Sequence, residues 1–196
     1  MKSFKDKLKA SAAAFCGLIA SAFVGDTLLV KGVFVAECYG ADGVLKWRDE
    51  FRNTVVTVGK NAMLDAALAG SAYTVTGPFM GLISSVSYTA ISASDTMASH
   101  SGWTEAGATN APTYTSPRKT CAWSAASAGA KALSAALSFA ITGTGTLKGA
   151  FLNYGSGATS VIDATAGTLF SAGLFTGGDR AVLNGDTVNV SYQVSL

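Results

Sequence analysis

The segment from Ala93 to Glu105, ASDTMASHSGWTE, holds the residues of this chain that are best suited to chemistry. It contains the only histidine, His100, with Asp95 close by and several serines that could complete a hydrolytic triad. A histidine and an aspartate on one loop are not specific for catalysis, and no GxSxG motif surrounds any serine. We therefore expect His100 to be a hydrogen-bonding loop residue, with a hydrolase that uses His100 and Asp95 as the competing hypothesis.

The same segment is well suited to holding a loop in place. Ser94 or Asp95 can cap a turn by accepting backbone N–H groups, and the large ring of Trp103 favours burial. Glu105 is expected to pair with Arg118 once the loop folds back. The segment is thus predicted to be a packed structural loop, and its main residues are Asp95, His100, Trp103, Glu105 and Arg118.

No other pattern indicates a cofactor, a metal or a nucleotide. The stretch GTGTLKG, residues 143–149, lacks the spacing of a phosphate-binding loop, and the aspartates do not form a calcium-loop pattern. Cys16, Cys38 and Cys121 are far apart and form no CxxC motif, so we expect these three cysteines to be small buried hydrophobic residues. No catalytic residue, cofactor-binding residue or metal ligand is predicted.

The composition favours a surface of small neutral side chains. Only 13% of the residues are charged, against about 25% in typical soluble proteins, whereas Gly, Ala, Ser and Thr are abundant. The net charge is +2, and the scattered Lys and Arg residues form no basic patch of the kind that binds nucleic acid. Such a surface suits burial against other subunits, and no nucleic-acid partner is expected.

From Gly32 onward the hydrophobic pattern is that of β-strands. A hairpin is predicted over residues 32–59 around a Gly-Ala-Asp-Gly turn, and residues 187–196 alternate most clearly between apolar and polar side chains. Further strands are predicted at 77–84, 118–123, 131–145, 146–156 and 167–175, and one short helix at 60–70. A helix remains an alternative for 131–145 and a helical turn for 167–175. The pattern indicates a mainly-β domain over 32–196, an antiparallel β-sandwich or jelly roll.

Residues 1–31 have a different character. Four lysines precede the apolar run Ala10–Val24, which is the pattern of a secretory signal. The run of about 15 residues is short for a membrane span, which needs about 20. We expect instead an Ala-rich helical arm that is kept in the mature protein and packs on the body or on a neighbouring subunit through Phe15, Leu18, Ile19 and Phe23. A retained signal and a membrane anchor are the alternatives, and no membrane association is expected.

Several short motifs follow one another along residues 32–196. They are GKNAMLD (59–65), GSAY (70–73), GLI (81–83), DTMASHSGWTE (95–105), Tyr114, Arg118, GAFL (149–152), LFSAGLF (169–175) and GDTVNVSY (185–192). In this order they resemble a family of small structural proteins of tailed bacteriophages. The block from Asp95 to Glu105 is the most specific part of the resemblance, and the Ala-rich stretch before Gly32 departs from the family pattern.

The resemblance implies a non-enzymatic virion protein. We expect a capsid decoration or cement protein on the capsid exterior, made in the host cytoplasm, which binds the major capsid protein and associates with itself as a dimer or trimer. A tail or head–tail component with a structural or adhesive role is the alternative. A receptor- or glycan-binding appendage would instead expose aromatic residues such as Tyr73, Tyr88 and Tyr114 on a rim.

Overall fold

The computed structural model describes residues 30–68 and 76–195, so the predicted arm, with its four contact residues, lies outside the described residues except for residues 30 and 31. The elements are β1 (Lys31–Tyr39), β2 (Leu45–Val55), α2 (Thr57–Leu68), β3 (Phe79–Ser84), β4 (Ala106–Gly107), β5 (Asn110–Thr113), β6 (Lys119–Thr120), β7 (Ala130–Ala132), β8 (Leu137–Ala140), β9 (Gly145–Tyr154), β10 (Thr168–Leu174), β11 (Arg180–Val182) and β12 (Thr187–Ser195).

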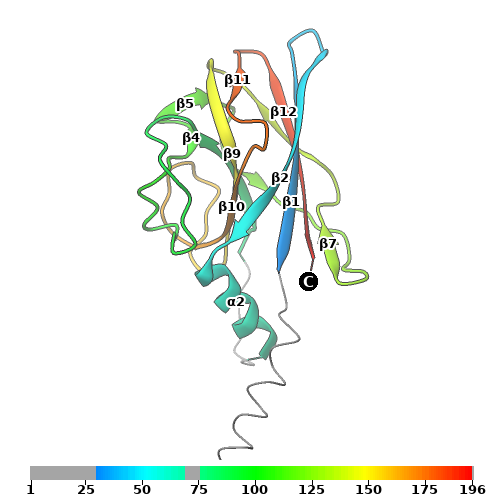
Figure 1. Ribbon diagram of the computed structural model, residues 1–196, viewed down its shortest axis with the longest axis vertical. Helices are drawn as coiled ribbons and strands as arrows, with labels where there is room; N and C mark the ends of the chain where they lie inside the picture. The colour runs from blue at the N-terminus through cyan, green and yellow to red at the C-terminus, as the bar shows by residue number, and fades with distance from the viewer. Residues whose placement is uncertain (1–29, 69–75, 196) are drawn as a thin grey trace, which may run out of the picture.

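Within the described residues, the predicted mainly-β antiparallel fold with one short helix is confirmed. The strands of the main sheet follow the order β6-β3-β9-β10-β2-β1-β12-β7, with β11 beside β9 and β8 beside β12, and β4 and β5 form a small parallel pair. The main sheet curls until it is nearly closed into a barrel (Figure 1). Segments that flank its two edges meet through backbone hydrogen bonds from Thr115 N to Ala140 O and from Ser134 N to Ala122 O, both 2.9 Å long.

The barrel interior is filled by alternate residues of the strands. In β1 every second side chain points inward, and Phe34 packs against Phe51 of β2 and Tyr192 of β12 with ring centroids 5.1 and 4.4 Å apart. The sheet register pairs Phe34 directly with both of these residues. Because side chains alternate between the two faces of a strand, a slip of one residue would turn this whole apolar set outward.

Two of the predicted strands are shorter than expected. Residues 131–145 do not form one strand but contribute to β7, β8 and the start of β9. The break between β7 and β8 arises because the stretch from Ala132 to Leu137 is longer than the part of β12 that it faces, from Gln193 to Val190. The strand predicted at 118–123 is reduced to β6, since the chain leaves β3 after Thr120 to bridge Leu133 through Trp123. The short strands β4, β5 and β11 were not predicted.

The molecule has a second apolar core outside the barrel. It lies on the outer face of β3, β9 and β10, beneath residues 85–105, which we call the covering loop. Its buried members are Val56, Ile83, Met97, Trp103, Phe151, Leu169 and Ala172. Strand β9 is therefore buried on both faces from Gly149 to Tyr154, whereas β1 alternates between buried and half-buried positions.

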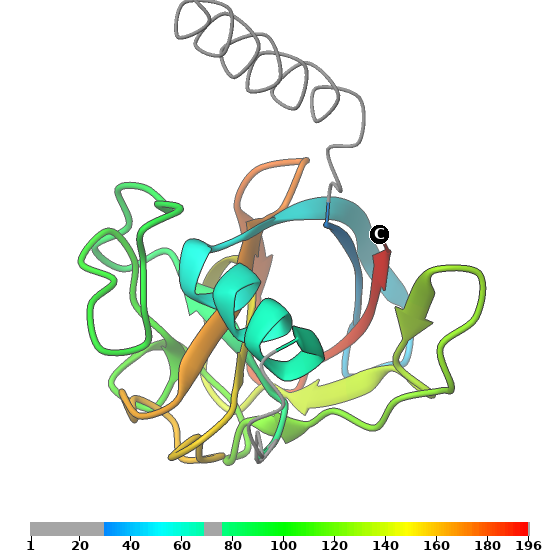
Figure 2. The ribbon, with the colours of Figure 1, turned by 90° about the horizontal axis from the view of Figure 1, so that it is seen from below.

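The lower end of the barrel is partly crossed by α2, which is seen from below in Figure 2. Strand β1 begins at this end, beside the end of β12, with Lys31 paired to Ser195. Within residues 30–68 and 76–195, no helix combines the length and the hydropathy needed to span a membrane.

Candidate functional site

Trp103 anchors the covering loop on the second core. The side chain is 1% exposed, and its ring packs against Phe151 of β9 at a centroid distance of 5.1 Å. Its indole Nε1 donates a hydrogen bond of 3.0 Å to the carboxylate of Asp95. Asp95 also accepts the backbone N–H of Ser92, so it fixes a turn and a ring at once. Asp95 and Trp103 thus hold the covering loop together and fix it on β9.

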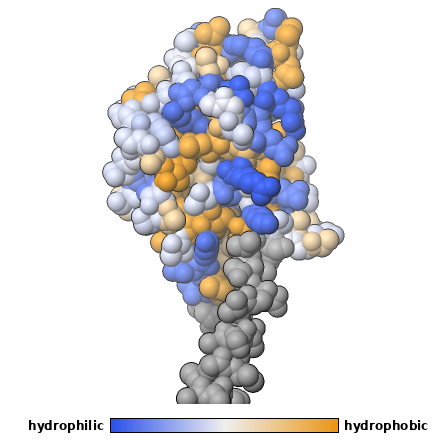
Figure 3. Space-filling view, in the orientation of Figure 1, coloured by the Kyte–Doolittle hydropathy of each residue, from blue (hydrophilic) through white to orange (hydrophobic). Residues whose placement is uncertain are grey.

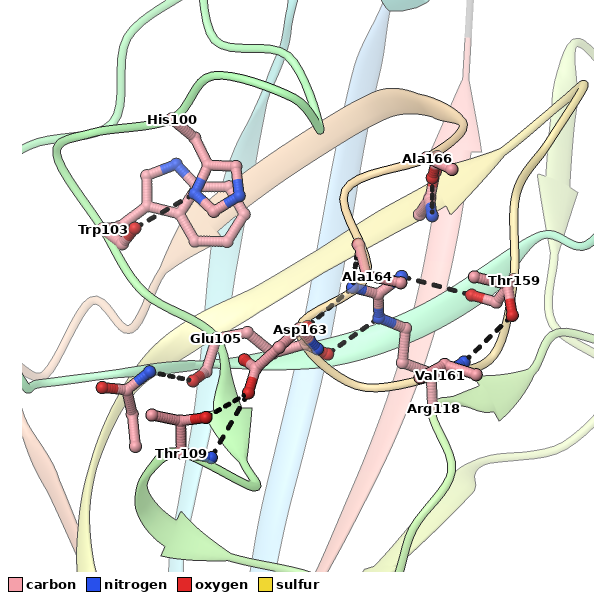
Figure 4. Close-up of polar contacts among 12 residues, drawn as sticks. His100, Trp103, Glu105, Thr109, Arg118, Thr159, Val161, Asp163, Ala164 and Ala166 are labelled. Atoms are coloured by element: carbon pink, nitrogen blue, oxygen red, sulfur yellow. Dashed lines mark hydrogen bonds and ion pairs between the residues drawn. The ribbon is translucent and has the colours of Figure 1, made fainter.

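His100 and Asp95 have different hydrogen-bond partners. The imidazole of His100 stacks on Trp103 with centroids 3.9 Å apart, and its Nδ1 lies 3.0 Å from the carbonyl oxygen of Trp103 (Figure 4). The carboxylate of Asp95 accepts hydrogen bonds from Trp103 Nε1 and Ser92 N. No hydrogen bond joins Asp95 to His100, although both residues lie in the described part of the chain. A triad that uses His100 and Asp95 would need a hydrogen bond between these two side chains, which is not among their contacts here.

Glu105 and Arg118 form the ion pair that the sequence suggested. Arg118 Nε and Nη2 donate to the two carboxylate oxygens of Glu105 at 2.8 and 2.6 Å. The side chain of Glu105 is 4% exposed and that of Arg118 is 0% exposed. The guanidinium also lies over the ring of Phe151, 5.4 Å from its centroid. Gly81 leaves room for this arrangement, because a Cβ there would meet both the Phe151 ring and Glu105 Oε1. We call this pair the Glu105–Arg118 clasp.

The clasp also holds a loop that sequence reasoning did not connect with it. Arg118 donates to the carbonyl oxygens of Thr159 and Ala164 at 3.2 and 2.8 Å, and Glu105 accepts the backbone N–H of Asp163 at 2.8 Å. Asp163, at φ 64°, in turn accepts the N–H and the hydroxyl of Thr109. No spacing in the sequence signals these backbone partners, because carbonyl and N–H groups are present at every position.

Burial dominates the electrostatics of this region. It raises the pKa of the Glu105 carboxyl, although Arg118 and the Asp163 N–H act in the opposite direction. It also raises the pKa of the Tyr114 phenol, and nearby Glu105 adds to that rise. Tyr114 is 3% exposed, so the exposed aromatic rim expected for a glycan-binding appendage is wrong for this residue.

A small cavity of 140 Å³ lies beside the clasp. Its walls include His100, Trp103, Glu105, Asn110, Arg118 and Asp163. This volume is well below the roughly 300–1,000 Å³ of pockets that bind drug-sized ligands or cofactors. Most polar groups in the walls already have internal partners, so the arrangement is suited to fastening three loops together.

Two further polar clusters fasten turns to the barrel. The carboxylate of Asp49 binds Arg180 and the N–H groups of Thr176 and Gly177. Asp186 likewise binds Lys46 and the N–H of Leu183. The described residues contain no group of three or more His, Cys, Asp or Glu side chains that could hold a metal ion.

Cys38 and Cys121 are free and buried, as their dispersed positions suggested, whereas Cys16 lies outside the described residues. Burial raises the pKa of both thiols to about 12; for Cys38, nearby Asp186 contributes as well. Because the thiolate is the reactive form of cysteine, both groups are poor nucleophiles and metal ligands in the folded protein. Both pack in the barrel core, where the Cys38 thiol also donates a weak hydrogen bond to Asp186.

Comparisons with family models, with curated proteins and with solved structures gave no significant match for this chain.

Proposed function

We propose that this protein is a non-enzymatic structural component of a bacteriophage particle, most specifically a capsid decoration protein. It would add contact area on the outside of the head, between major capsid subunits, and associate with itself there. The family assignment rests on the order of short motifs, in which the block from Asp95 to Glu105 is the most specific.

The observation that carries the non-enzymatic part of the proposal is the use of that block for packing. Asp95 binds Trp103 and a turn, His100 stacks on Trp103, and Glu105 is engaged by Arg118 and a backbone N–H. A catalytic loop would present such groups to a substrate with free hydrogen-bonding capacity. Here Asp95, Glu105 and the Nδ1 atom of His100 are engaged by internal partners, as in a loop that its own side chains hold in place.

The outer surface supports a function based on contact area. Hydrophilic and hydrophobic side chains are interspersed over the face seen in Figure 3, without segregation into one charged and one apolar region. On the outer face of β1 and β12, the half-buried side chains of Val33, Val35 and Ser191 are small. Small side chains lose little conformational entropy on burial, which favours these three positions as points of subunit contact.

Cryo-electron microscopy of whole particles of the virus that encodes this chain tests the proposal. A decoration protein is expected in many copies on the head lattice, in contact with the major capsid protein. A ring at the tail or at the head–tail joint would reject decoration and support the tail alternative. Absence of the chain from purified particles, measured by mass spectrometry, would reject a virion protein altogether.

The hydrolase hypothesis is tested separately with the purified protein. A panel of ester, peptide and glycan substrates is expected to show no turnover that depends on His100. Turnover that is lost in His100→Ala while the circular dichroism spectrum stays unchanged would overturn the non-enzymatic assignment. The variant Ala98→Gln, two residues away on the exposed loop, is the matched control, because it removes no candidate catalytic group.

A further inference from the structure

The lower end of the barrel carries an apolar pocket of 240 Å³. Its walls include Trp123, Leu152, Tyr154, Phe170 and Val194, with Lys131 at the rim. Trp123, Phe170 and Val194 pack against the main core and yet remain partly exposed. The pocket is therefore the end of the barrel core, and none of the described residues seals it.

The size and chemistry of the pocket indicate what can fill it. Pockets for drug-sized ligands and cofactors measure roughly 300–1,000 Å³ and place several polar groups to orient the ligand. This pocket is smaller, and its walls are apolar side chains apart from Lys131. Burying apolar surface stabilises a complex by roughly 25 cal/mol per Å². A few large apolar side chains of a polypeptide fit this site better than a small polar ligand.

The path of the chain brings such side chains to the pocket. Strand β1 begins at Lys31, and the register pairs Gly32 with Val194, a wall residue. The residues that precede β1 therefore join the barrel beside the pocket. The linker Gly25–Leu29 can span at most about 3.3–3.6 Å per residue, roughly 17 Å in all, which places the apolar run Ala10–Val24 within reach.

We propose that this apolar pocket receives the apolar run Ala10–Val24 of the same chain. Phe15, Leu18, Ile19 and Phe23 stand at the i, i+3, i+4 and i+8 spacing with which one face of a helix enters an apolar groove. A short linker gives the run of the same chain a high effective concentration at the pocket, which favours it over the run of a second copy. The inference does not depend on the proposed virion function.

Photo-crosslinking in the full-length purified protein tests this docking. A benzophenone amino acid replaces Leu18 in one variant and Ala13 in the matched control, since Ala13 falls on the opposite side of a helix through these residues. The Leu18 variant is expected to crosslink within one chain to peptides that contain Trp123, Tyr154 or Phe170, several-fold more strongly than the control.

Three results would overturn the proposal. Crosslinks that map elsewhere on the barrel would reject this pocket as the docking site, and equal yields from the two positions would reject a specific apolar face. A crosslinked band at the mass of a dimer would reject docking within one chain and assign the pocket to the run of a second copy.

A charge placed in the pocket provides an independent measurement. Val194→Lys puts a second ammonium group beside Lys131, its register partner on β7, and is expected to lower the crosslink yield from position 18 about tenfold, because an unpaired charge in an apolar wall is costly to bury. Gln193→Lys is the matched control, since Gln193 is exposed and points to the other face of β12. An unchanged yield in a folded Val194→Lys variant would contradict the proposal. If that variant fails to fold, the peptide map with the unchanged pocket decides.

Discussion

The two outer faces of the barrel are built from neighbouring strands of one sheet, but they differ in whether a loop covers them. The face of β3, β9 and β10 is apolar and lies under the covering loop, with Phe151 and Leu169 fully buried. The face of β1, β2 and β12 has no such cover among the described residues, and its outward side chains are half-buried or exposed. One side of the sheet serves as the base of a second core, whereas the other is left as a surface.

The comparison also separates two kinds of polar contact. On the covered side, the Glu105–Arg118 clasp is buried and joins three segments of the chain. On the uncovered side, Arg48 is 51% exposed and pairs with Glu37 and Glu50 at longer distances, 3.4 and 3.7 Å. Exposed pairs of this kind are screened by water and salt, whereas a buried pair leaves a costly unpaired charge when one partner is lost.

Removing the ring of Trp103 is expected to have the largest effect. Trp103→Ala should lower the free energy of unfolding by about 3–5 kcal/mol, because it opens a cavity in the second core and removes the partner of Asp95. Chemical denaturation measures this change. Val35→Ala, on the uncovered face, should cost only about 0.5 kcal/mol. Similar losses in the two variants would show that the covering loop is no more essential than an open surface.

Breaking the clasp is expected to be the next largest effect. Arg118→Met should cost about 3 kcal/mol, because it leaves the Glu105 carboxylate buried without its cation. The double variant Glu105→Gln/Arg118→Met should recover much of that loss, since no charge is then left buried. Arg48→Met on the uncovered face should change stability by no more than about 1 kcal/mol. A double variant as unstable as Arg118→Met would mean that the packing of Arg118 and its hydrogen bonds to Thr159 and Ala164, and not the buried charge, dominate at the clasp.

The pH dependence of stability is expected to come from the buried carboxylates that hold turns. Burial opposes ionisation of Asp49, but Arg180 and the N–H groups of Gly177 and Thr176 outweigh it and lower its pKa. A carboxyl group whose pKa is lowered by folding stabilises the protein above its ordinary pKa of about 3.9 and loses that contribution as the pH falls through the lowered value.

Thermal melts between neutral and acid pH measure this contribution. Asp49→Asn should be less stable than the parent at neutral pH, and the difference should shrink as the pH falls below about 4. The neighbouring Glu50→Gln, at a 59% exposed side chain, should follow the parent at every pH. A constant difference between Asp49→Asn and the parent would indicate that lost hydrogen-bond geometry, and not charge, causes the destabilisation.

The fold was predictable where one strand faces water and the core alternately. The alternation around Val188, Val190 and Tyr192 identified β12, and the change of period after residue 59 identified α2. The near closure of the sheet was not predictable, since it depends on edge contacts such as Thr115 N to Ala140 O that no local pattern encodes. The break between β7 and β8 was missed for the same reason, because it arises from the mismatch with β12.

The candidate site was predictable in its side chains and not in its partners. Burial of Trp103 and the pairing of Glu105 with Arg118 could be inferred from residue type and proximity in the sequence. The stacking of His100 on Trp103 and the carbonyl acceptor of Ala164 could not, because both depend on how distant loops meet. Side-chain chemistry is read from residue identity, whereas backbone partners are set by the fold.

The pairing of β1 with β12 has a consequence for how the chain folds. The first strand of the barrel forms its hairpin with β2 at once, yet its other edge stays unpaired until the last strand has been synthesised. Contacts between residues so distant in sequence form slowly, and an unpaired strand edge can meanwhile recruit a strand from another chain. The time between synthesis of β2 and of β12 is therefore the period in which the nascent protein is most exposed to strand exchange and aggregation.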